Sequence, residues 1–167
     1  TKAIEDYAVK QKEISQKLEA NKVFFEIQDE VNLIQDELKN DFDELNSVNN
    51  FNQRFKAISD TKLSLIKNKN VKTILQNKLD LEYPEFVSKV KRNSRDALET
   101  QIKFDHDTTQ NILLGQRILT EDPKEKKLLE DKLIENEILY NNNTNSGEVE
   151  LNKSINKLKS DLLISDV

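Results

Sequence analysis

The residues best suited to chemistry in this sequence are three consecutive polar side chains, Asp105, His106 and Asp107. Histidine changes charge near physiological pH and carboxylates coordinate hard cations, so the cluster fits a pH-sensitive site or a weak divalent-metal site. The alternative is a polar turn between two helices, in which Asp107 caps the helix that follows. Because Gln110 stands three residues after Asp107, as in a capping box, the sequence favours the turn.

Most other catalytic motifs are excluded by composition; paired carboxylates could still do acid–base work, but the 31 acidic residues give no way to choose two. The chain has 167 residues, with two glycines, one histidine and no cysteine. Two distant glycines cannot build a phosphate-binding loop, and one histidine cannot build a two-histidine metal site. Without cysteine there is no disulfide, thiolate chemistry or cysteine-based zinc site. No serine lies in a tight turn flanked by glycines, where a nucleophile would be exposed. We therefore expect no enzyme, no cofactor and no metal.

A second candidate site is a cluster of basic residues, Lys89, Lys91, Arg92 and Arg95. One interpretation is attraction to an acidic membrane surface, at about 1 kcal/mol for each basic residue near anionic lipid. The other is pairing within the chain, since residues 54–95 carry a net charge of +7 and residues 26–44 a net charge of −7. The matching magnitudes favour pairing between antiparallel helices. The total net charge of −5 argues against a nucleic-acid partner.

The elements that position these residues are predicted to be helices. Two glycines and two prolines are too few for the tight turns of a sheet protein. Because 34% of the residues are charged and 35% hydrophobic, the core must be a thin stripe along each helix. We predict an all-α protein, an elongated helical bundle or antiparallel coiled coil of about five to six helices, with a long first helix.

Two apolar stripes define the first helix. The clearest stripe has helical spacing and comprises Ile27, Val31, Ile34, Leu38, Phe42, Leu45 and Val48. An upstream stripe, one residue out of phase with it, comprises Ile4, Tyr7, Gln11, Ile14 and Leu18. The alternatives are a break near Ala20 and Asn21 or one continuous helix across residues 19–25, and the absence of a strong helix breaker favours the continuous helix. The four asparagines within residues 46–52 then predict a bend or a hairpin.

Shorter helices are expected after residue 68. The spacing predicts one over residues 71–81, another that begins at Pro84, and a third from Asp107 to Leu119. Asp122, Pro123 and Glu125 form a strong helix start. The predicted organisation is a helical bundle or coiled-coil unit over residues 1–140, an Asn-rich loop over 141–147 and a short amphipathic helix over 148–167.

In the carboxyl-terminal third, the helices have apolar side chains on more of their surface than one neighbouring helix can cover. Residues 112–119 and 128–140 are apolar around most of the helix, which indicates a protein partner or a homo-oligomer. The expected contact residues are Leu129, Leu133, Leu139, Leu151, Ile155, Leu158 and Leu162. In the competing arrangement, the last helix folds back and covers residues 128–140 within the same chain.

Three interpretations of function follow. The first is a non-enzymatic interaction module, that is, a scaffold, tether or regulatory subunit of an intracellular assembly that binds proteins through coiled-coil surfaces. The second is a helical bundle on the surface of a bacterium that binds a host or extracellular ligand. The third is a membrane-trafficking bundle, since the layout loosely resembles the amino-terminal bundle and SNARE segment of syntaxins, although five or six unequal helices fit a three-helix bundle poorly. The sequence favours the first interpretation and a cytoplasmic location.

Overall fold

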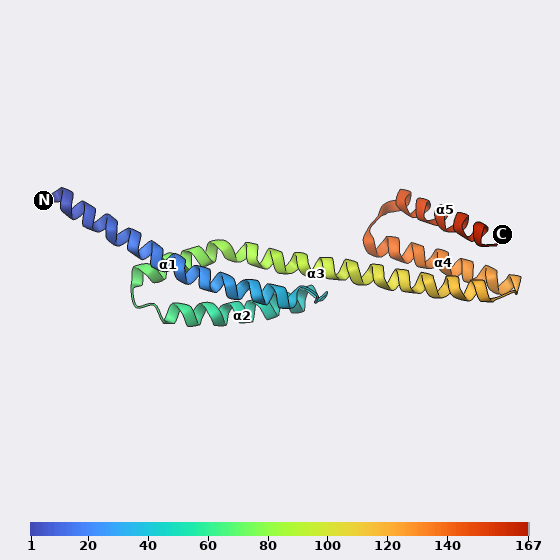
Figure 1. The fold of residues 1–167 in the computed structure, drawn as a ribbon, viewed down its shortest axis with the longest axis horizontal. Coiled ribbons are helices and arrows are strands. Elements are labelled where there is room, and N and C mark those ends of the chain that lie inside the picture. Colours follow the sequence, from blue (N-terminus) through green and yellow to red (C-terminus); the bar gives the residue numbers. More distant parts are fainter. Residues whose placement is uncertain (167) are drawn as a thin grey trace. The chain divides into compact units, whose positions relative to one another are not determined.

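The computed structural model describes residues 1–166, and this part of the chain folds into five α-helices without a strand (Figure 1). The helices are α1 (Lys2–Leu38), α2 (Glu44–Ser64), α3 (Lys69–Leu119), α4 (Pro123–Thr144) and α5 (Gly147–Ser165). The prediction of an all-α protein with a long first helix is confirmed. α1 is also continuous across residues 19–25, as its sequence indicated.

The chain forms two compact units, residues 1–97 and residues 98–167, and the boundary falls within α3. The first unit contains α1, α2 and the first part of α3. The second contains the remainder of α3 together with α4 and α5. Each unit therefore has three helical segments, and each has its own buried residues.

The core of the first unit is an apolar stripe from each of its three helices. From Gln16 to Ile34 the buried residues of α1 follow one another at intervals of three or four, which places them on one face of the helix. Phe51 of α2 is fully buried in the same core and stacks on Phe55 at 5.7 Å between ring centroids. The core comprises Ala20, Phe24, Ile27, Val31, Ile34, Phe51, Ile66, Val71, Leu75, Leu79, Phe86 and Val90.

The turn between α1 and α2 lies at residues 39–43, earlier than predicted. The Asp43 side chain accepts a hydrogen bond from the Asn46 N–H at 3.0 Å and so caps α2. Asp41 accepts hydrogen bonds from the Asp43 N–H at 2.9 Å and from the Asn46 side chain at 2.7 Å. These bonds fix the turn before the asparagine run, which is helical. The prediction of a bend at 46–52 is wrong, and Phe42 and Leu45 are exposed instead of continuing the stripe.

α3 is a single helix, so the predicted breaks near Pro84 and Asp107 are wrong. The helix starts where Asn68 accepts hydrogen bonds from the N–H groups of Asn70 and Val71, at 2.8 and 3.2 Å. Proline disfavours helical conformation in the residue before it. Here that residue, Tyr83, is held by contacts with α2.

The contacts that hold α3 on both sides of Pro84 come from two residues of α2. The Tyr83 hydroxyl donates to Asn52, and the rings of Tyr83 and Phe86 lie 5.4 and 6.0 Å from the Phe55 ring. Leu75, Leu79, Phe86 and Val90 keep one helical face through the proline. Tertiary packing therefore overrides the local signal of Pro84.

The second unit begins with the helix start that the sequence predicted. Asp122 caps α4 by accepting from the Lys124 N–H at 2.9 Å, and Pro123 occupies the first turn. The predicted loop at 141–147 is much shorter, because α4 continues to Thr144. Asn145 adopts the left-handed conformation (φ 54°), and Gly147 follows with φ 82°, a region where only glycine is unstrained.

Candidate functional site

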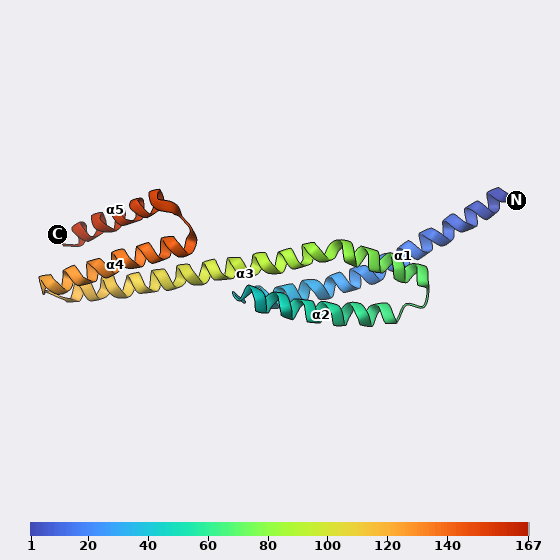
Figure 2. The ribbon, with the colours of Figure 1, turned by 180° about the vertical axis from the view of Figure 1, so that it is seen from behind.

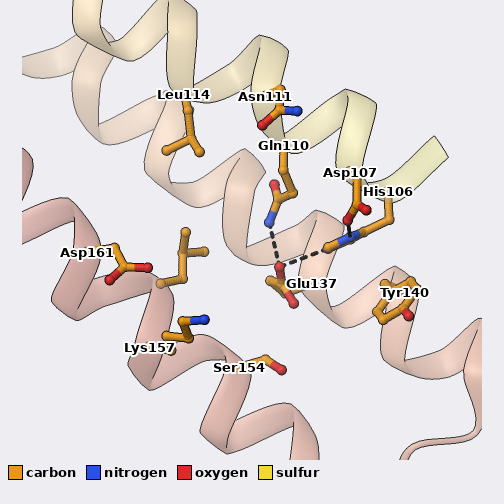
Figure 3. A pocket seen from close by; sticks show the side chains of 11 residues that line it. His106, Asp107, Gln110, Asn111, Leu114, Glu137, Tyr140, Ser154, Lys157 and Asp161 are labelled. Atoms are coloured by element: carbon orange, nitrogen blue, oxygen red, sulfur yellow. Dashed lines mark hydrogen bonds and ion pairs between the residues drawn. The ribbon is translucent and has the colours of Figure 1, made fainter. Parts of the chain in front are cut away.

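His106 lies within α3, and its imidazole ring connects α3 to α4. Its Nε2 atom is 2.8 Å from Oε1 of Glu137 on α4, and its Nδ1 atom is 3.0 Å from Oδ1 of Asp107. The ring packs against Tyr140 with 4.3 Å between centroids. Gln110, one turn further along α3, donates to the same Glu137 oxygen at 2.6 Å (Figure 3). The prediction of a turn between helices at this position is therefore wrong.

A polar groove of about 560 Å³ opens beside this cluster, lined by side chains of α3, α4 and α5 (Figure 3). Ser154 lines the groove, but carboxylates engage both nitrogens of His106, so the ring is not directed at that hydroxyl as in a Ser–His pair. Among residues 1–166, no three His, Asp or Glu side chains are grouped in a way that could hold a metal ion. The geometry gives the cluster a role in joining α3 to α4.

The acidic and basic segments pair within the first unit. The ion pairs between them are Glu26–Lys62 at 3.3 Å, Glu37–Arg54 at 2.5 Å and Glu44–Arg95 at 3.0 Å. Exposed pairs contribute only about 0–1 kcal/mol each. Their effect is therefore to favour one alignment of the helices over others.

The basic cluster is divided between internal pairing and solvent. Arg95 pairs with Glu44, and Arg92 pairs with Glu85 at 3.2 Å. Lys89 and Lys91 are exposed on either side of Val90, which is buried in the core. The four basic residues thus do not form one continuous free patch.

The seven residues expected to contact a partner are divided among three environments. Leu129, Leu133 and Leu162 are buried, Leu151, Ile155 and Leu158 are half-buried, and Leu139 is 57% exposed. α5 packs on α4, but Leu128 and Leu139 of α4 remain 54% and 57% exposed, so the apolar surface of α4 is covered only in part. The structure thus has the competing arrangement, in which the last helix folds back within the same chain.

Arg117 of α3 forms hydrogen bonds with α4 and with the end of α5. Its Nη2 atom donates to Asp166 at 2.6 Å and to Glu130 at 2.9 Å, and its Nη1 atom donates to the Ser165 hydroxyl at 3.1 Å. The hydrogen bond with Asp166 raises the pKa of Arg117 and lowers the pKa of Asp166. Sequence reasoning missed this residue, because a single arginine within the apolar run 112–119 does not reveal which carboxylates surround it.

The first part of α1 has no partner within its unit. Every residue from 1 to 15 is exposed, and Gln16 is the first buried one. In both views the start of α1 extends beyond α2 and α3 (Figures 1 and 2). The upstream stripe is therefore open to solvent, and Ile4, Tyr7 and Leu18 are 68%, 65% and 64% exposed. We call Ile4, Tyr7, Gln11, Ile14 and Leu18 the amino-terminal stripe.

The amino-terminal stripe and the buried face of α1 point in nearly opposite directions. Successive helical residues are about 100° apart, so Leu18 and Ala20 project on opposite sides of the helix. Ala20 is fully buried in the core, whereas Leu18 is exposed. The phase difference between the two stripes in the sequence was the signal for this second face. It did not show which face is covered.

Comparison of the chain with protein-family models, with curated proteins and with solved structures found no match. In the part of the chain that the structure describes, no helix combines the length and apolar character needed to cross a membrane. The fold and the exposed α1 face are thus the observations on which a functional proposal rests.

Proposed function

We propose that this chain is a non-enzymatic helical interaction module, a scaffold, tether or regulatory subunit, that binds another protein by pairing a partner helix with the amino-terminal stripe of α1. One observation carries the proposal: an amphipathic helix presents an apolar face that its own unit leaves uncovered.

The energetics of an isolated helix support a partner. Helices shorter than about 12–15 residues are marginal in water even when rich in alanine. Residues 2–15 bury no side chain, so their helix is stabilised only by continuity with the packed part of α1. Pairing the stripe with another helix would remove the exposed Ile4, Tyr7, Ile14 and Leu18 from water and stabilise the segment.

Site-specific cross-linking in the cells that produce the protein tests this function. A photoreactive side chain at position 7 or 14 should cross-link to a partner, while the same group at position 65, another exposed apolar site on the first unit, should not. The product from position 7 should disappear in an Ile14→Asp, Leu18→Asp variant that keeps its helical circular dichroism. Equal yields from positions 7, 14 and 65, or no product from any of them, would contradict the proposal.

The alternative of a bacterial surface protein that binds a host ligand would use the same exposed face. The identity of the cross-linked partner separates the two. A subunit of the same cell supports the intracellular module, and a host or extracellular protein supports the alternative.

A further inference from the structure

The residues that flank the amino-terminal stripe carry positive charge only. In heptad notation Ile4, Gln11 and Leu18 occupy a positions, and Tyr7 and Ile14 occupy d positions. The e and g positions beside them, from residue 3 to residue 22, are Ala3, Ala8, Lys10, Ser15, Lys17 and Lys22. Ala3, Ala8, Lys10 and Ser15 lie within residues 1–15, where no side chain is buried. Lys17 and Lys22 lie near the end of the stripe, after this segment.

From this charge pattern we infer that the partner of α1 is an amphipathic helix whose own apolar stripe is flanked by Glu or Asp. Charges at e and g positions set partner choice, because they face the partner across the edges of the apolar seam. The acidic residues of the segment, Glu5, Asp6, Glu13 and Glu19, occupy b and c positions, away from the seam. This inference rests on the proposed function and adds the chemistry of the partner.

A second copy of this chain fits the stripe poorly. In a parallel pair, Lys17 would face Lys22 of the other copy. In an antiparallel pair, g positions face g positions, so Lys10 and Lys17 would face the lysines or Ala3 of the other copy. No register brings a carboxylate to either edge of the seam. Like charges at these positions disfavour self-pairing.

An anionic membrane also fits poorly. Binding of an amphipathic helix to such a surface depends on buried apolar area together with net positive charge. Residues 1–20 contain four lysines and four acidic residues, and Gln11 lies at the centre of the stripe. The segment therefore has no net electrostatic attraction to acidic lipid.

The test uses the full chain and two synthetic 28-residue peptides with Ile at a and Leu at d positions. One has Glu at every e and g position, and the other has Lys. Binding is followed by fluorescence anisotropy of labelled peptide at low and high salt. The Glu peptide should bind at least tenfold more tightly than the Lys peptide, and the difference should shrink at high salt because exposed charges are screened.

Charge-reversal variants give a matched control. Lys10→Glu, Lys17→Glu should invert the preference so that the Lys peptide binds more tightly. Lys2→Glu, Lys12→Glu changes the net charge equally but at positions away from the seam, so the wild-type preference should remain. All four residues are exposed, so both variants should keep the fold, which circular dichroism checks.

Each remaining outcome has a definite meaning. If neither peptide binds, the proposed function itself is wrong. If both bind equally and Ile14→Asp, Leu18→Asp abolishes binding, the interaction function stands and the acidic partner is wrong. If light scattering shows a dimer that this variant disrupts, the occupant is a second copy. If phosphatidylserine vesicles bind in place of the Glu peptide, it is a membrane. Both of the last results overturn the inference.

Discussion

Replacing Pro84 by alanine is expected to stabilise the unit of residues 1–97. Proline has no N–H, so the carbonyl of Asp80, four residues earlier, lacks its helical hydrogen bond. Pro84 is exposed and contributes little to the core, so the substitution removes no packing. Proline within a helix is about 3 kcal/mol less favourable than alanine. Asp80 is an exposed residue, so hydration of its carbonyl offsets part of this cost, and we expect a gain of about 1–3 kcal/mol.

The assay is thermal and urea unfolding of the full chain, followed by circular dichroism. Each kcal/mol raises the melting temperature of a domain of this size by roughly 4–8 °C. Ser88→Ala, at another exposed position of α3, controls for general helix propensity and should change stability by about 0.5 kcal/mol or less. An unchanged stability in Pro84→Ala would indicate that the helix is interrupted there in solution. A loss would show that Tyr83 and Phe86 need the proline to pack on Phe55.

Three further predictions concern the packing of both units. Leu133→Ala should destabilise the second unit by about 2–5 kcal/mol, because Leu133 is fully buried. Leu139→Ala should change the stability by about 0.5 kcal/mol or less, because Leu139 is exposed. Equal effects of the two substitutions in urea melts would refute the assigned faces. Deleting residues 148–167 should uncover Leu129 and Leu133 and increase the mass measured by light scattering, and an unchanged mass would contradict coverage by α5. The hydrogen bond from the Asp43 N–H lowers the pKa of Asp41, so its stabilising effect is present above the ordinary pKa of aspartate and is lost as the pH falls through the lower folded value. The difference in urea midpoint between wild type and Asp41→Asn should therefore shrink below about pH 4, and a constant difference would refute this role.

Periodicity and composition predicted the fold class because they reflect which faces of the helices meet water. The stripes of α1 and α5 and the start of α4 at Asp122 and Pro123 were readable since each depends on neighbouring residues only. The length of α3 could not be predicted from the local sequence. It depends on Phe55 and Asn52 holding Tyr83 and Phe86 from another helix, and local sequence at Pro84 indicated a break.

For the candidate surfaces, too, the local sequence predicted the apolar faces, but only the tertiary structure shows which faces are covered. Both stripes of α1 were visible in the sequence, but only the fold shows that the core covers one of them and leaves the other open. The apolar residues around α4 predicted that another helix covers it. Whether α5 or another molecule covers it depends on the short connection at Asn145 and on the contacts of Arg117 with Ser165 and Asp166.

Amide hydrogen exchange along α1 tests the central claim most directly. The claim is that the first part of α1 has no packing partner within its own chain and pairs with an acidic helix of another protein. In the free protein the amides of residues 4–15 should exchange much faster than those of residues 24–36, because only the latter segment is packed in the core. Adding the Glu-flanked peptide should slow exchange over residues 4–18, and adding the Lys-flanked peptide should not. If residues 4–15 of a monomeric free protein exchange as slowly as residues 24–36, α1 is already covered within its own chain, and the account is contradicted.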